Sequence, residues 1–199
     1  MTELINKEIN NTANIYLSVI KRDNNNFAIL TKWFYILFTR FRAAKENNPR
    51  YIITRYYLSR VAKKLGFYSK FNYCFSHSGA YSAVLFSSES DLISVDIERV
   101  GRKLPASLRL KVRSFFPELL LSELKVIMIL ESLVKFQIPT RKFSFLSFFS
   151  GEDSVQILPL RDSVFEVNVN NCKVYSKIYT FAGLYICITL ESDRFNLSL

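Results

Sequence analysis

The sequence contains a single histidine, His77, among its 199 residues. Sites that require two or more imidazole side chains are therefore excluded. The glycine-rich phosphate-binding motifs G-x-x-x-x-G-K-[ST] and G-x-G-x-x-G are also absent, which excludes the P-loop and dinucleotide-binding classes. The chain lacks a G-x-S-x-G element as well, so a hydrolase that carries a Ser-His-Asp triad on such a turn is disfavoured.

Cysteines are few, and long apolar runs are missing. Cys74, Cys172 and Cys187 lie in apolar, β-like runs without the spacing of metal ligands, which is typical of reduced thiols in a cytosolic protein. No run approaches the roughly 18 apolar residues that a membrane-spanning helix needs. Glu3 and Glu8 are not typical of a signal peptide. We therefore expect a cytoplasmic protein without a membrane partner.

The charge balance is strongly basic. Lys and Arg number 27 against 17 Asp and Glu, which gives a formal net charge of +10. Such a charge indicates a polyanionic partner, which could be nucleic acid, an anionic membrane, a phosphorylated cofactor or an acidic protein. The 18 Phe and 11 Tyr residues fall mainly on core positions and are not interleaved with Lys and Arg. This pattern disfavours a stacking surface for bases, so we expect no nucleic-acid partner.

Hydrophobic patterns predict an α+β chain. Strand-like alternation occurs at 13–20, 71–77, 81–87, 91–98, 143–149, 163–169, 173–181 and 184–190. Helical spacing occurs at 50–65, 107–116 and 117–137, with Pro117 suited to the first turn of the last helix. Strands and helix thus occur in each half, so we predict two similar halves, residues 1–100 and 101–199. Because both halves belong to one chain, a monomer can build a site between them, and we expect a monomer.

Two carboxylates share one face of an expected strand. Side chains alternate along a strand, so Asp96 and Glu98 project to the same side, about 7 Å apart at their Cα atoms. Mg²⁺ takes one or two protein carboxylates and completes its octahedron with water and phosphate oxygens. The alternative interpretation is a solvated acidic face on an edge strand, because D-x-E sequences are common.

Glu131 and Lys135 lie in an expected helix that is apolar nearly all round. A charge buried in such a helix is costly unless it meets a partner, which favours a functional role. The alternative is an ordinary i, i+4 pair worth about 0.2–0.5 kcal/mol. Two interpretations also remain for His77, the lone histidine between Ser76 and Ser78. It is either a structural residue or part of a functional site.

In their order along the chain, three segments resemble the motifs of the 4'-phosphopantetheinyl transferases of the larger, surfactin-type class. They are Phe71-Asn72-x-x-x-Ser76-His77-Ser78-Gly79, Val95-Asp96-Ile97-Glu98 and Glu131-Ser132-x-x-Lys135. Their order and spacing match the family, and the resemblance covers roughly residues 13–190. It implies an α+β fold of two similar α/β halves with pseudo-two-fold symmetry and the active site between them.

The resemblance also implies a cofactor and a substrate. Mg²⁺ would be held by Asp96, Glu98 and Glu131. The substrate is coenzyme A, whose phosphates would contact Arg50, Ser76 and His77.

A catalytic role and a partner follow from the same resemblance. Glu131 would help to deprotonate a serine of an apo acyl or peptidyl carrier protein, and Lys135 would contact phosphate. Adenosine 3',5'-bisphosphate would leave. This post-translational modification is typical of secondary metabolite biosynthesis.

The sequence departs from the family pattern in four places, one of which is Gln137-Ile138-Pro139 in place of the glycine-rich stretch expected after the lysine. The glycine before the acidic pair is Ser94 here, and the W-x-x-K-E motif reads Ile127-Met128-Ile129-Leu130-Glu131, without its tryptophan and first lysine. The Gly-Lys-Pro strand before the Phe-Asn motif is also missing. The alternative is therefore a catalytically impaired relative that binds coenzyme A or a carrier protein.

Overall fold

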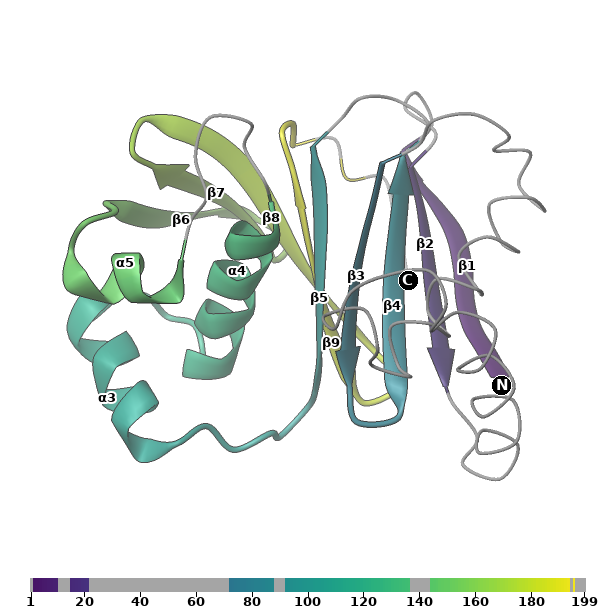
Figure 1. Cartoon of the computed structure of the whole chain (residues 1–199), viewed down its shortest axis with the longest axis horizontal. Coiled ribbons are helices and arrows are strands. Elements are labelled where there is room, and N and C mark those ends of the chain that lie inside the picture. The colour runs from purple at the N-terminus through teal and green to yellow at the C-terminus, as the bar shows by residue number, and fades with distance from the viewer. Residues whose placement is uncertain are drawn as a thin grey trace, which may run out of the picture.

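The computed structural model describes residues 2–10, 15–21, 72–87, 92–136, 144–193 and 195. These residues form two antiparallel sheets and three helices (Figure 1). The prediction of an α+β chain is confirmed. None of the helices that these residues form is both long and apolar enough to cross a membrane. Arg50 and the helix expected at 50–65 lie outside the described residues.

The first sheet has four strands in the order β1-β2-β4-β3. They are β1 (Thr2–Asn10), β2 (Ile15–Lys21), β3 (Asn72–Ser78) and β4 (Tyr81–Ser87). Strands β3 and β4 form a tight hairpin whose turn includes Gly79 at a φ of 57°, a left-handed conformation that glycine adopts without strain. The strands expected at 71–77 and 81–87 are confirmed, whereas β1 was not predicted.

The second sheet has five strands in the order β5-β9-β8-β7-β6. They are β5 (Ile93–Arg99), β6 (Val155–Arg161), β7 (Val164–Val169), β8 (Cys172–Phe181) and β9 (Leu184–Leu190). Strand β5 pairs with β9, so the boundary between the two sheets falls between β4 and β5. Strand β6 contains Pro159 and lies at the sheet edge, where a residue without an N–H group is tolerated.

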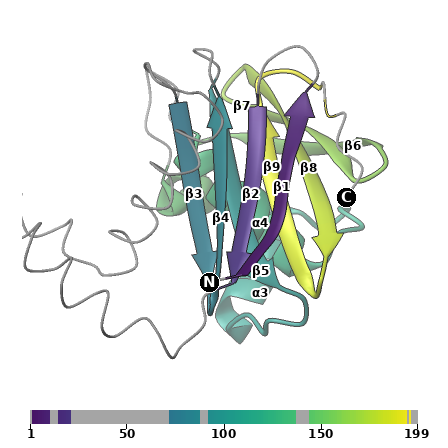
Figure 2. The same cartoon turned by 90° about the vertical axis from the view of Figure 1, so that its right-hand side faces the viewer.

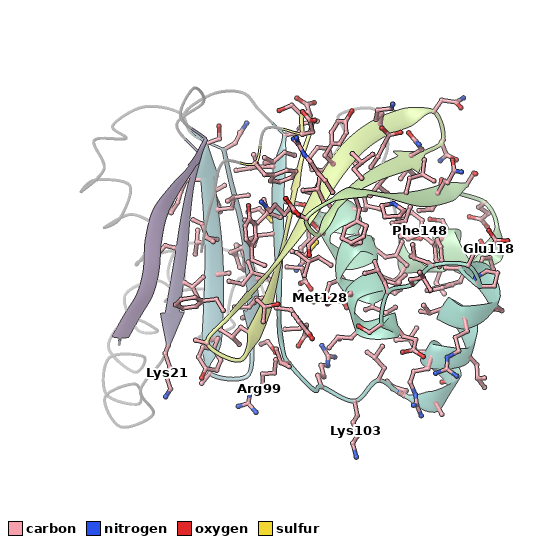
Figure 3. All side chains as sticks on the ribbon, turned by 180° about the vertical axis from the view of Figure 1, so that it is seen from behind. Lys21, Arg99, Lys103, Glu118, Met128 and Phe148 are labelled. Atoms are coloured by element: carbon pink, nitrogen blue, oxygen red, sulfur yellow. The ribbon has the colours of Figure 1, made fainter. Side chains whose placement is uncertain are left out.

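The helices are α3 (Ala106–Phe115), α4 (Glu123–Lys135) and α5 (Phe145–Ser150). Helix α4 packs across β5 and β9 on the face of the second sheet that is turned away from the first sheet (Figure 1). Met128 of α4 and Phe148 of α5 are buried in the core between the helices and this sheet (Figure 3). The arrangement has three layers: the first sheet, the second sheet and the helices.

Two predicted elements are wrong. Helix α4 begins at Glu123, with Ser122 as its N-cap residue, and Pro117 lies in a turn outside the helix. The segment 143–149 was expected to be a strand, but most of it forms α5. The side chains and backbone N–H groups of Ser144 and Ser147 bond reciprocally in a capping box, and Gly151 ends the helix at a φ of 79°. These local bonds favour a short helix over the apolar alternation.

The two sheets share a core, and their edges meet. Leu17 and Leu85 of the first sheet belong to one buried cluster with Val95, Ile97 and Ile186 of the second. Figure 2 shows the first sheet in front of β8 and β9. Strand β3, an edge of the first sheet, runs beside β5, an edge of the second (Figure 1). We call this contact between β3 and β5 the seam.

Candidate active site

One cavity lies at the seam and at the end of α4. Its volume is about 700 Å³, and β3, β5 and α4 all contribute to its wall. The wall includes every site residue predicted from the sequence except Arg50, namely Ser76, His77, Asp96, Glu98, Glu131 and Lys135. The three motifs are therefore brought together, although more than 50 residues separate Ser76 from Lys135 in the sequence.

Strands β3 and β5 run in the same direction, and side chains bridge the seam in register. Ser76 Oγ donates to Asp96 Oδ1 at 2.8 Å, and Ser78 Oγ donates to Glu98 Oε2 at 2.6 Å. The Val95 N–H group donates to Cys74 Sγ at 3.4 Å. The alternation of Ser76 and Ser78 on β3 thus matches the alternation of Asp96 and Glu98 on β5, which places both carboxylates on the helix side of the second sheet.

Lys135 is the cation that meets Asp96. Its Nζ lies 2.6 Å from Asp96 Oδ1, 2.8 Å from Ser76 Oγ and 3.4 Å from the Val95 carbonyl oxygen. All three ammonium protons therefore have oxygen acceptors. The sequence left open an i, i+4 pair between Lys135 and Glu131, but in the structure Lys135 forms an ion pair with Asp96 on a different element. The Asp96 side chain is 2% exposed, so removal of Lys135 would leave a buried carboxylate without its cation.

The second carboxylate of the D-x-E pair is fully engaged. Glu98 Oε1 forms an ion pair with Arg102, and Oε2 accepts the hydrogen bond from Ser78. The contacts of Arg102 and Ser78 with Glu98 were not predicted from the sequence. Two sequence features could have indicated them: Arg102 follows Glu98 by four residues, and Ser78 lies on the same strand face as Ser76.

Glu131 lies half-buried in the same wall. Burial raises the pKa of Glu131, and the nearby negative charge of Asp96 raises it further, while the Lys135 and Arg102 charges act in the opposite direction. A carboxyl whose pKa is raised accepts a proton more readily near neutral pH, as a general base requires.

Asp96 carries an orphan acceptor atom. Its Oδ2 is buried and has no hydrogen-bond partner among the described residues. A buried carboxylate oxygen next to a second carboxylate, Glu131, is suited to bind a divalent cation, because hard cations prefer oxygen ligands. Yet within the parts of the chain that the structure describes, no group of three His, Cys, Asp or Glu side chains is arranged to hold a metal ion. A cation at this position would therefore have to take further oxygen atoms from a ligand.

His77 and Ser76 lie in different surroundings. His77 is exposed and lines the cavity, so it can reach a ligand there. Ser76 is buried, and its hydroxyl already bonds to Asp96 and Lys135. Ser76 thus orients the charged pair.

We expect Glu131→Gln to change how stability depends on pH when metal is removed. Folding raises the pKa of Glu131 above its ordinary value of 4.5. The protonated carboxyl therefore contributes its full stability below pH 4.5, and this contribution is lost as the pH rises through the pKa of the folded state. The variant lacks this loss, so its free energy of unfolding should exceed that of the wild type increasingly as pH rises towards neutrality.

Urea denaturation in EDTA, followed at a series of pH values, measures this difference. Glu118→Gln is the matched control, because Glu118 is an exposed glutamate outside the cavity (Figure 3). A difference between Glu131→Gln and the wild type that stays constant with pH would contradict the prediction.

No protein-family model matches this chain, and no curated protein matches it in sequence. A functional assignment therefore depends on the chemistry of the cavity and on the resemblance of the three motifs.

Proposed function

We propose that this chain is a Mg²⁺-dependent 4'-phosphopantetheinyl transferase. It would move the phosphopantetheine group from coenzyme A to a serine of an apo acyl or peptidyl carrier protein. One observation carries the proposal: Ser76 and His77 of β3, Asp96 and Glu98 of β5, and Glu131 and Lys135 of α4 line one cavity. A cavity of about 700 Å³ also lies within the usual range for sites that bind cofactor-sized ligands.

The proposed transfer breaks one P–O bond and forms another, and a residue of the cavity wall accepts the proton that is released. The carrier serine Oγ attacks the phosphorus that bears the pantetheine arm, and a new O–P bond forms. The P–O bond to the second phosphate of the pyrophosphate breaks, and adenosine 3',5'-bisphosphate leaves with that electron pair. The serine proton passes to the Glu131 carboxylate, whose raised pKa favours this transfer.

Charge in the cavity supports the same chemistry. A magnesium ion held by Asp96 and Glu131, with Glu98 beside them, would supply positive charge to the pyrophosphate. Lys135 holds the Asp96 side chain in place through its contact with Oδ1. His77 is exposed and lines the cavity, and in the proposed reaction it would contact a phosphate oxygen of coenzyme A. Phosphoryl-type transfer depends mainly on such positioning and charge stabilisation.

A second candidate is a relative that binds coenzyme A or a carrier protein without catalysis. One feature favours it: Arg102 and Ser78 already occupy both oxygens of Glu98. A carboxylate engaged in this way does not ligate a metal until those partners release it. Binding of coenzyme A without modification of any carrier would identify this candidate.

The test is intact-mass analysis of purified apo carrier proteins after incubation with the protein, coenzyme A and Mg²⁺. We expect one carrier to gain the mass of one phosphopantetheine group and to remain unmodified when EDTA is present. A carrier variant in which the acceptor serine is alanine is the control and should gain no mass. No gain on any carrier, with the protein folded, would overturn the transferase in favour of the non-catalytic relative.

A further inference from the structure

A row of buried hydroxyl groups crosses the second sheet beneath α4. Ser94 of β5, Thr189 of β9 and Ser176 of β8 are in register across these three strands. Ser132 of α4 lies over the row, with its Oγ 2.6 Å from Ser94 Oγ and 2.7 Å from Thr189 Oγ1. Thr189 Oγ1 lies 2.7 Å from Ser176 Oγ. All four residues are fully buried, and we call them the hydroxyl row.

The number of hydroxyl protons determines which group donates in each hydrogen bond of the hydroxyl row. Ser94 Oγ donates its single proton to the Ser132 carbonyl oxygen at 2.8 Å, so Ser132 must donate in its contact with Ser94 Oγ. The Ser132 proton is then used, so Thr189 donates to Ser132, and Ser176 donates to Thr189 by the same reasoning. Every hydroxyl proton in the row has an acceptor, so these buried polar groups are satisfied.

The hydroxyl row lies next to the cavity along both elements that it joins. Ser94 precedes Asp96 by two residues, so both side chains lie on the helix face of β5. Ser132 directly follows Glu131 and precedes Lys135 by three residues, about one helical turn. Helix α4 is thus joined to β5 at two neighbouring points: the contacts of Ser132 with Ser94 and the ion pair of Lys135 with Asp96.

The rest of the α4 interface is apolar. Its buried residues include Val126, Ile127, Met128, Ile129, Leu130 and Leu133. Aliphatic contacts are not directional, so they hold a helix on a sheet without fixing its position along the strand to a fraction of an ångström. Hydrogen bonds depend steeply on distance and angle. The hydroxyl row therefore fixes the last turns of α4 relative to β5.

We infer that Ser94, Ser132 and Thr189 are positioning residues that set Glu131 and Lys135 against Asp96. Among the described residues, the hydroxyls of Thr189 and Ser94 bond to Ser132 and Ser176 and not to the site carboxylates or the ammonium group, so they act through Ser132 and α4. The part of this inference that concerns turnover rests on the proposed function. The part that concerns the place of Lys135 does not.

Thr189→Val tests the inference, because valine resembles threonine in shape but neither donates nor accepts a hydrogen bond. Brief acetylation of the folded protein followed by peptide mass spectrometry gives the labelling of Lys135 relative to that of exposed Lys103 in the same molecule. We expect this ratio to rise severalfold in Thr189→Val, because α4 is no longer fixed and Lys135 spends less time on Asp96. Thr189→Ser keeps the hydroxyl and should restore the wild-type ratio.

Ser94→Ala is the second variant and removes the other end of the contact with Ser132. Ser94→Ala should raise the labelling of Lys135 relative to Lys103, as Thr189→Val does. If Thr189→Val does not fold, Ser94→Ala alone tests the inference. Ser18→Ala is the matched control, because it removes a buried hydroxyl from β2 in the other sheet. Wild-type labelling of Lys135 in folded Thr189→Val or folded Ser94→Ala would overturn the inference.

The transfer assay gives a second, separate readout. If the wild type transfers phosphopantetheine, Thr189→Val should lower kcat and leave the KM for coenzyme A nearly unchanged, since the positioned groups act in the transition state. A rise in KM with kcat unchanged would contradict a positioning role. If the wild type shows no transfer, the proposed function fails while the labelling result still decides whether the hydroxyl row places Lys135.

Discussion

Asp96→Asn should lower the rate of the proposed phosphopantetheine transfer by about 10²- to 10³-fold, because the variant loses the charge that Lys135 contacts and that the proposed magnesium ion would contact. The side chain keeps its size, so the core around β5 should stay packed. The Oδ1 of asparagine can still accept from Ser76 and Lys135, and the Lys135 side chain is 30% exposed, so we expect the loss of stability to be much smaller than the loss of rate. Transfer assays at saturating Mg²⁺ and urea denaturation measure the two effects.

Asp153→Asn is the matched control for this variant. Asp153 is also a buried aspartate, 4% exposed, and its Oδ1 accepts from Asn170 Nδ2 at 2.6 Å. It lies outside the wall of the cavity, so its substitution should leave the transfer rate near that of the wild type. If Asp96→Asn kept the wild-type rate, Asp96 would have no part in holding a metal.

Lys135→Met should lower the free energy of unfolding by about 3 kcal/mol at neutral pH, because it leaves the buried Asp96 carboxylate without its cation. Methionine fills much of the space of the lysine stem, so loss of packing contributes little. The double variant Asp96→Asn/Lys135→Met removes both charges and should recover most of the stability. Urea denaturation of the wild type, both single variants and the double variant gives the coupling between the two side chains.

Lys173→Met, in β8 of the second sheet, is the matched control for Lys135→Met. Lys173 Nζ lies 3.0 Å from Glu166 Oε2, but the lysine side chain is 53% exposed. An exposed pair of this kind contributes about 0–1 kcal/mol, so the variant should lose little stability. Additive effects of Asp96→Asn and Lys135→Met would show that the contact between them has no energetic consequence.

Alternation and turn residues were enough to predict β3, β4 and β5, because short strands that end at glycine or serine clusters carry their signal locally. The start of α4 was not predictable from Pro117, since a proline can occupy a turn as readily as a first helical turn. Strand β6 was missed because Pro159 argues against a strand unless its edge position is known.

The membership of the candidate site was predictable from its motifs, but the pairing inside it was not. Sequence spacing offers Glu131 as the partner of Lys135, four residues away. The structure pairs Lys135 with Asp96, 39 residues away, because α4 packs against β5. The hydroxyl row is equally hidden, since Ser94 and Thr189 become neighbours only through the register of β5 on β9.

The seam also differs in kind from the strand pairs within each sheet. Strands β3 and β5 belong to different hydrogen-bonded sheets, and side-chain bonds such as those of Ser76 with Asp96 and Ser78 with Glu98 join them. Each such bond contributes about 0.5–1.5 kcal/mol, or somewhat more where a charge is involved. Separating β3 from β5 at these points would therefore break side-chain bonds and no backbone ladder. Loss of the Ser76 and Ser78 hydroxyls should thus loosen the contact between the two strands, while both sheets and the apolar core that they share stay intact.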